Sequence, residues 1–117
     1  MPPRSPLSIA TGALERLTKE EKSYHQELKE QEARVEKVKG QPDDEEGNKK
    51  YQLKQEHQVL EQTKGMISTL KDKIVEAMAK LEQQLETVKN EKNPNPEEIT
   101  KAKEVLAQAK SSYREIA

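Results

Sequence analysis

The sequence predicts an all-α fold, an elongated antiparallel three-helix bundle of the coiled-coil or spectrin-like kind. The chain of 117 residues holds three Tyr and no Phe or Trp, and charged residues make up 37% of it. So few large apolar groups disfavour a globular core with a deep cleft, and a sheet would need more β-branched and turn residues. Apolar residues instead recur at alternating steps of three and four, which is the repeat of amphipathic helices.

The first helix is expected over residues 7–39. Residues 1–6 form a short lead that we expect to be disordered, because its prolines prevent helix propagation. Within this lead, Ser5 and Pro6 suit the N-cap and the first helical position. Eight of the ten stripe positions are apolar or Tyr. The stripe comprises Leu7, Ala10, Leu14, Leu17, Glu21, Tyr24, Leu28, Gln31, Val35 and Val38.

The second helix is expected over residues 48–90, after a turn at residues 40–47 that is rich in Gly and acids. Gly40 suits a left-handed residue that ends the first helix, and Asn48 suits the next N-cap. The stripe of this helix comprises Leu53, His57, Leu60, Lys64, Ile67, Lys71, Ile74, Met78, Leu81, Leu85 and Val88. Three further apolar residues widen its face, as suits a bundle: Met66, Leu70 and Ala77.

The third helix is expected over residues 96–116. Asn95 suits its N-cap, and Pro96 and the acids that follow suit its first turn. Its stripe comprises Ile99, Ala102, Leu106, Ala109, Tyr113 and Ile116. Because both connecting loops are short, neighbouring helices should be antiparallel and form a single bundle domain over residues 7–117.

Composition disfavours several functional classes. Lys and Arg number 21 against 22 Asp and Glu, so the basic excess of a nucleic-acid binder is missing. The chain has no Cys, which excludes disulfides and thiolate metal sites. No apolar run has the length of a membrane span, and the N-terminus lacks the apolar region of a signal peptide. We therefore expect a soluble, cytoplasmic protein.

Catalytic motifs are absent from the sequence, so we do not expect an enzyme. His25 and His57 are the two histidines, and each is interpreted as a partly buried or surface residue. A metal ligand or a proton relay is the alternative for either. The acidic run at residues 43–46 is interpreted as a solvated loop, with a cation or a basic partner as the alternative.

Polar residues on the stripes permit two interpretations. They are Glu21, Gln31, Lys64 and Lys71. They lie at the bundle margins with their stems along the core, or they specify register or contact another protein. Tyr24 and Tyr113 lie on stripes and are expected in the core. Tyr51 lies off the stripe, so we expect it to be exposed and available for binding.

Two collinear blocks of residues carry a family resemblance. The first block holds Arg16-Leu17-Thr18-Lys19-Glu20-Glu21, Tyr24, Glu27-Leu28-Lys29, Gln31-Glu32, Val35 and Lys37-Val38-Lys39. The second holds Lys54-Gln55, Val59-Leu60, Met66-Ile67, Leu81 and Leu85. In order and spacing they resemble the first two helices of the tubulin-binding cofactor A family, over roughly residues 10–88. This chain has Ser68 where the family often has Pro.

The resemblance implies a function. Family members capture β-tubulin released from the cytosolic chaperonin, keep it apart from α-tubulin and pass it to the next tubulin-folding cofactor. The resemblance implies no cofactor, nucleotide hydrolysis or metal, no nucleic-acid or membrane partner, a cytoplasmic and cytoskeleton-associated location, and a monomer or weak homodimer. The β-tubulin-binding candidates are matching residues off the stripes: Arg16, Lys19, Glu20, Glu27, Glu32, Lys54 and Gln55. The alternative is a structural or adaptor coiled-coil protein that homodimerises or binds another helical partner.

Overall fold

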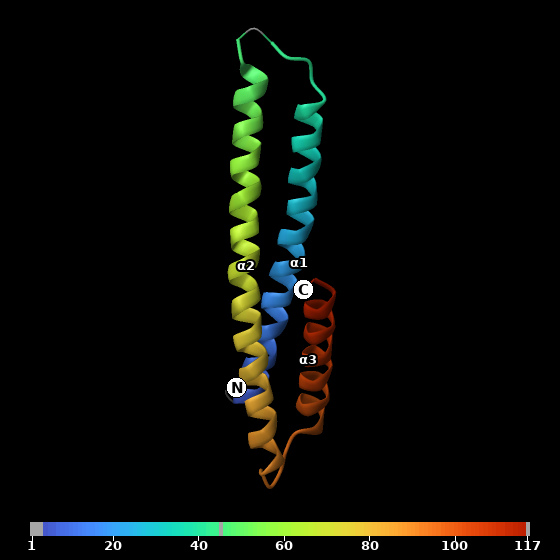
Figure 1. The fold of residues 1–117 in the computed structure, drawn as a ribbon. Coiled ribbons are helices and arrows are strands. Elements are labelled where there is room, and N and C mark those ends of the chain that lie inside the picture. Colours follow the sequence, from blue (N-terminus) through green and yellow to red (C-terminus); the bar gives the residue numbers. More distant parts are fainter. Residues whose placement is uncertain (1–3, 45, 117) are drawn as a thin grey trace. The chain divides into compact units, whose positions relative to one another are not determined.

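The computed structural model describes residues 4–44 and 46–116, with side chains as far as residue 113. Within these ranges it contains three α-helices and no strand, which confirms the predicted all-α class (Figure 1). The helices are α1 (Pro6–Lys39), α2 (Asn48–Lys89) and α3 (Pro96–Ile116). Several predicted features lie outside the described residues: residues 1–3 of the lead, Glu45 of the acidic run, Ala117 and the side chain of Ile116. No described helix combines the length and hydropathy that a membrane crossing requires.

The first and third helices begin with the predicted caps. The Ser5 hydroxyl oxygen accepts a hydrogen bond from the backbone N–H of Ser8 at 3.1 Å. The Asn95 side-chain oxygen accepts bonds from the backbone N–H groups of Glu97 at 3.0 Å and Glu98 at 3.4 Å. Each cap satisfies donors that have no partner within the helix, which fixes where the helix begins.

The second helix begins differently from the prediction. Asn48 is its first residue, and its backbone N–H donates to the Asp44 carboxylate at 2.8 Å, so the Asn48 side chain is not the N-cap. The left-handed glycine is Gly47, with φ of 74°, rather than Gly40. Gly40 needs no such conformation, because its N–H donates to the carbonyl of Glu36 at 3.1 Å and continues the helical pattern.

The chain forms two compact units. Unit 1 combines residues up to Glu20 with residues from Leu70 onward, and unit 2 comprises Glu21–Thr69. Unit 1 therefore holds the N-terminal part of α1, the C-terminal part of α2 and all of α3. Unit 2 holds the remaining parts of α1 and α2 and the loop between them.

Unit 1 is a three-helix core. Its buried cluster comprises Leu7, Leu14, Ile74, Ala77, Leu81, Val88, Ala102, Val105 and Ala109. Alanines on α3 let that helix approach the large side chains of α1 and α2 closely. Two ion pairs tie α3 to its neighbours, Lys101 to Glu15 at 3.8 Å and Lys110 to Glu82 at 2.8 Å.

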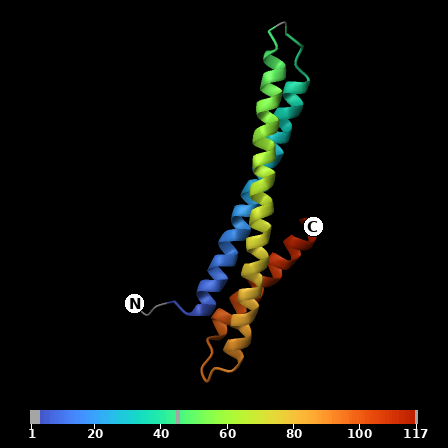
Figure 2. The same cartoon turned by 60° about the vertical axis from the view of Figure 1, so that its left-hand side comes forward.

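Unit 2 is a hairpin of two antiparallel helices, which lie side by side in both views (Figures 1 and 2). Its buried apolar residues are Val35, Val38, Leu60 and Ile67. Three polar side chains are buried as well: Glu21, Gln31 and Thr63. Glu21 and Gln31 therefore occupy the core positions that the stripe assigns to them.

The buried face of α2 differs in part from the predicted stripe. Residues 60, 67, 74, 81 and 88 are buried as predicted. Between them the buried positions are Thr63, Leu70 and Ala77. The stripe had instead placed Lys64, Lys71 and Met78 there, but Lys64 is exposed and the other two are half-buried. Water solvates a lysine ammonium far better than a core does, so the helix turns its smaller residues inward.

The tyrosines follow the prediction only in part. Tyr51 is 64% exposed, as predicted, and Tyr24 is half-buried. Tyr113 is 39% exposed, so its predicted core position is wrong. Tyr113 lies in the last turn of α3, and its side chain carries a polar hydroxyl that favours contact with water over full burial.

Candidate functional site

The histidines form no metal site in the part of the chain that the structure describes. No group of three or more His, Asp or Glu there lies close enough together to hold a metal ion. His25 is partly buried, with Nε2 4.0 Å from the Glu21 carboxylate one turn earlier on α1, and His57 is exposed.

All seven predicted contact residues are exposed, which makes each of them accessible to a partner. The structure divides them between the units. Arg16, Lys19 and Glu20 belong to unit 1, and the other four belong to unit 2. Each group is best considered within its own unit.

The three candidates of unit 1 are neighbours on one exposed side of α1. Arg16 and Glu20 are one turn apart and share a face. Lys19 is one turn beyond Glu15, whose carboxylate pairs with Lys101 of α3 at 3.8 Å. Lys19 therefore lies nearest to the α3 side of α1, and Arg16 lies only about 60° further around the helix.

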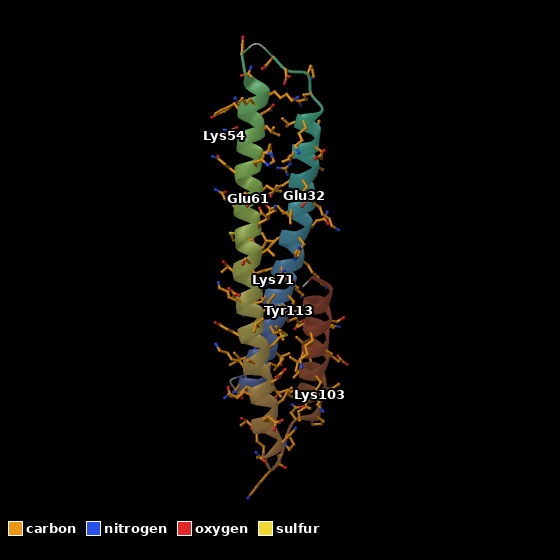
Figure 3. All side chains as sticks on the ribbon, in the orientation of Figure 1. Glu32, Lys54, Glu61, Lys71, Lys103 and Tyr113 are labelled. Atoms are coloured by element: carbon orange, nitrogen blue, oxygen red, sulfur yellow. The ribbon has the colours of Figure 1, made fainter. Side chains whose placement is uncertain are left out.

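The four candidates of unit 2 point in different directions. Glu32 lies about 140° around α1 from Glu27, since each helical residue adds about 100°. Lys54 lies on the side of α2 that faces away from α1 and therefore away from Glu32, which belongs to α1 (Figure 3). The Gln55 side-chain amide donates to the Tyr51 hydroxyl at 3.1 Å, so these two residues form a local pair. The seven predicted residues therefore do not form a single patch.

Sequence reasoning missed a groove between α1 and α2 in unit 1. The groove has a volume of about 680 Å³. Its apolar lining includes Ile9, Ala10, Ala13, Leu17 and Ala77, and Lys73, Glu76 and Lys80 lie along its α2 side. Ile9 is 56% exposed. The sequence contained one indication of this groove, because Ile9 and Ala13 are apolar, lie one turn apart and both fall outside the predicted stripe.

Further exposed apolar side chains lie on α2 in unit 2. Val59 and Met66 are 40% and 47% exposed, and their spacing of seven residues places them on one face. Tyr51 is exposed on the same helix. Single exposed apolar side chains are common on protein surfaces, so these residues do not by themselves mark a binding site.

These features define a class of protein, a helical binding protein that presents charged and apolar helix faces. Within this class the chain belongs to the tubulin binding cofactor A family, whose model matches residues 2–106. This family comprises chaperones, so the chain is not an enzyme.

Individual relatives support the same assignment. The tubulin-specific chaperone A of Saccharomyces cerevisiae is 42% identical over 102 residues, which cover 86% of this chain and 92% of the relative. That of Gallus gallus is 33% identical over 105 residues, which cover 89% of this chain and 90% of the relative. The crystal structure of tubulin folding cofactor A from Arabidopsis thaliana superposes with a TM-score of 0.75 at 28% identity, covering 90% of this chain and 92% of that chain.

Proposed function

We propose that this chain is a tubulin-folding chaperone of the cytoplasm that captures β-tubulin after its release from the cytosolic chaperonin. It holds β-tubulin apart from α-tubulin and hands it to the next tubulin-folding cofactor for assembly of the αβ-heterodimer. The observation that carries this proposal is the family match over residues 2–106. The relatives' coverage of nearly the whole chain supports it further.

The helical surfaces suit a protein that holds a partner and then releases it. Preformed helices lose little conformational freedom on binding, which limits the entropic cost of association. Exposed apolar side chains such as Val59 and Met66 cover apolar surface on the partner. The surrounding charges govern the association rate and specificity more than the affinity, so release stays easy.

Co-elution from a sizing column tests the choice of partner. The full chain is mixed with isolated β-tubulin and, separately, with α-tubulin. We expect a complex with β-tubulin alone. A complex with both tubulins would contradict the selectivity, and a complex with neither would contradict the proposed function.

Charge reversal tests the predicted contact residues. Lys19→Glu and Glu32→Lys alter exposed side chains on α1, so circular dichroism should show unchanged helicity. We expect each variant to bind β-tubulin about threefold to tenfold more weakly, as charged rim residues do. Because the two residues lie in different units, each variant reports on its own surface. Unchanged binding by both would remove these residues from the interface.

A further inference from the structure

The groove of unit 1 lies on the side of α1 that faces away from α3. Glu15 of α1 pairs with Lys101 of α3 at 3.8 Å. Ala13, which lines the groove, precedes Glu15 by two residues and is therefore about 160° away around the helix. On α2, Lys80 of the lining likewise precedes Glu82, which pairs with Lys110 of α3, by two residues. The groove therefore lies mainly on the side of α1 and α2 away from α3, and it shares Ala77 with the buried core.

The dimensions of the groove match an α-helix. Its lining on α1 extends from Pro6 to Leu17, which at about 1.5 Å per residue is roughly 16 Å, or three helical turns. Its lining includes three alanines, Ala10, Ala13 and Ala77, which leave room for larger apolar side chains of an incoming helix. A groove of this form is typical of recognition of one amphipathic helix through residues spaced three, four and seven apart.

The charges beside the groove are mainly positive. Lys73 and Lys80 lie one heptad apart along its α2 side, and Arg16 follows Ile9 by seven residues on the α1 side. Glu76 is the acid among the lining residues, and Glu20 lies one turn beyond Arg16 on the same face of α1, so three cations stand against two carboxylates. In the described part of the chain, none of the three cations lies within 4.0 Å of a carboxylate. This surface is therefore electrostatically complementary to an acidic segment, although the whole chain has a net charge of −1.

We infer that this groove binds one amphipathic helix of the β-tubulin chain, whose apolar ridge is flanked by carboxylates. The inference rests on the proposed function and assigns it a site. The apolar ridge packs onto the alanines, and the flanking carboxylates face Lys73, Lys80 and Arg16. This site differs from the predicted set of contact residues, with which it shares only Arg16.

A pair of matched variants tests this site. Ala13→Arg places a long charged side chain in the groove, whereas Ala107→Arg makes the same change on the exposed side of α3 in the same unit. We expect Ala13→Arg to bind β-tubulin at least about tenfold more weakly and Ala107→Arg to bind like the wild type. Thermal unfolding followed by circular dichroism checks that both variants remain folded.

A second pair of variants leaves the apolar lining intact. Lys73→Glu reverses a charge beside the groove, and Lys103→Glu reverses an exposed charge on α3 (Figure 3). We expect Lys73→Glu to weaken binding about threefold at low salt, with a smaller effect at high salt, and Lys103→Glu to have no effect. If Ala13→Arg fails to fold, the difference in β-tubulin binding between Lys73→Glu and Lys103→Glu tests the groove assignment by itself.

The outcomes separate the inference from the function on which it rests. If the wild type binds β-tubulin and Ala13→Arg and Lys73→Glu bind equally well, the groove assignment is wrong and the proposed function stands. If the wild type does not bind, both are wrong. Light scattering without tubulin adds one further outcome. If the wild type dimerises and Ala13→Arg abolishes the dimer, the groove binds a second copy of this chain and the assignment to tubulin is overturned.

Discussion

Gln31 is the most deeply buried polar side chain among the described residues, at 2% exposed. Its amide nitrogen donates to the Glu27 carboxylate at 3.4 Å, and its amide oxygen has no hydrogen-bond partner. An unsatisfied buried acceptor costs about 1–3 kcal/mol relative to its hydrated state. Gln31 thus lowers the stability of unit 2, and a core position is occupied by a group that prefers water.

Replacing Gln31 by Leu should therefore stabilise the protein. We expect Gln31→Leu to raise the free energy of unfolding by about 1 kcal/mol, because it removes the unsatisfied oxygen and keeps a similar volume. Urea denaturation followed by circular dichroism measures this change. Gln26→Leu, at an exposed position of the same helix, is the control and should change stability by less than about 0.5 kcal/mol. A loss of stability in Gln31→Leu would contradict this expectation and show that the Gln31 amide makes net stabilising interactions in the hairpin.

The caps show how far local sequence determines structure at single residues. Ser5 and Asn95 were predictable, because each cap bonds to an N–H group only two or three residues away. The position of the left-handed glycine could not be predicted in the same way. Gly47 adopts that conformation where the loop returns to α2, next to the bond between Asp44 and Asn48. The path of the loop decides which glycine is used, and local propensity does not encode that path.

At the scale of helices, the apolar repeat predicted the helices but not the full register of α2. Two stripes are possible on α2, and both contain residues 60, 67, 74, 81 and 88. One stripe adds Lys64 and Lys71 between them, and the other adds Thr63 and Leu70, so the repeat alone favours neither. The choice depends on which side of α2 meets its partners. Leu70 and Ala77 gave the correct signal, because the predicted widening of the apolar face already included both.

The attachment of α3 depends on small residues, and this leads to a prediction. Ala102 is fully buried in the core of unit 1. Ala102→Leu adds three methyl or methylene groups where no space exists, so we expect the free energy of unfolding to fall by about 1–3 kcal/mol. Ala107→Leu makes the same change on the exposed side of α3 and should be nearly neutral. Chemical denaturation compares the two, and equal stability of both variants would contradict close packing of α3.

At the scale of the whole molecule, the candidate site was harder to predict than the fold. Matching residue types identified exposed charges, but they could not show that these charges are divided between two compact units. The groove has lining from two helices that are more than 50 residues apart in the sequence, for example Ala13 and Ala77. Such a surface is visible only when the pairing of the helices is known, because each helix contributes only half of its lining.

The two units differ in how much apolar surface they bury. Unit 1 has a cluster of nine buried residues drawn from three helices. Unit 2 has two helices, and Glu21, Gln31 and Thr63 lie among its buried residues. Because local opening requires less free energy where fewer apolar contacts are lost, the helical hydrogen bonds of unit 2 should open more often.

Hydrogen exchange measured by mass spectrometry tests this difference directly. We expect amides in residues 24–36 and 53–66 to exchange at least about tenfold faster than those in residues 74–88 and 100–109, since a factor of ten corresponds to only about 1.4 kcal/mol. Gln31→Leu supplies an internal control, because it should slow exchange in unit 2 and leave unit 1 unchanged. Equal rates in the two units, or slowing of both by Gln31→Leu, would show instead that they open together as one cooperative unit. Slower exchange in unit 2 would mean that its buried polar groups stabilise the hairpin.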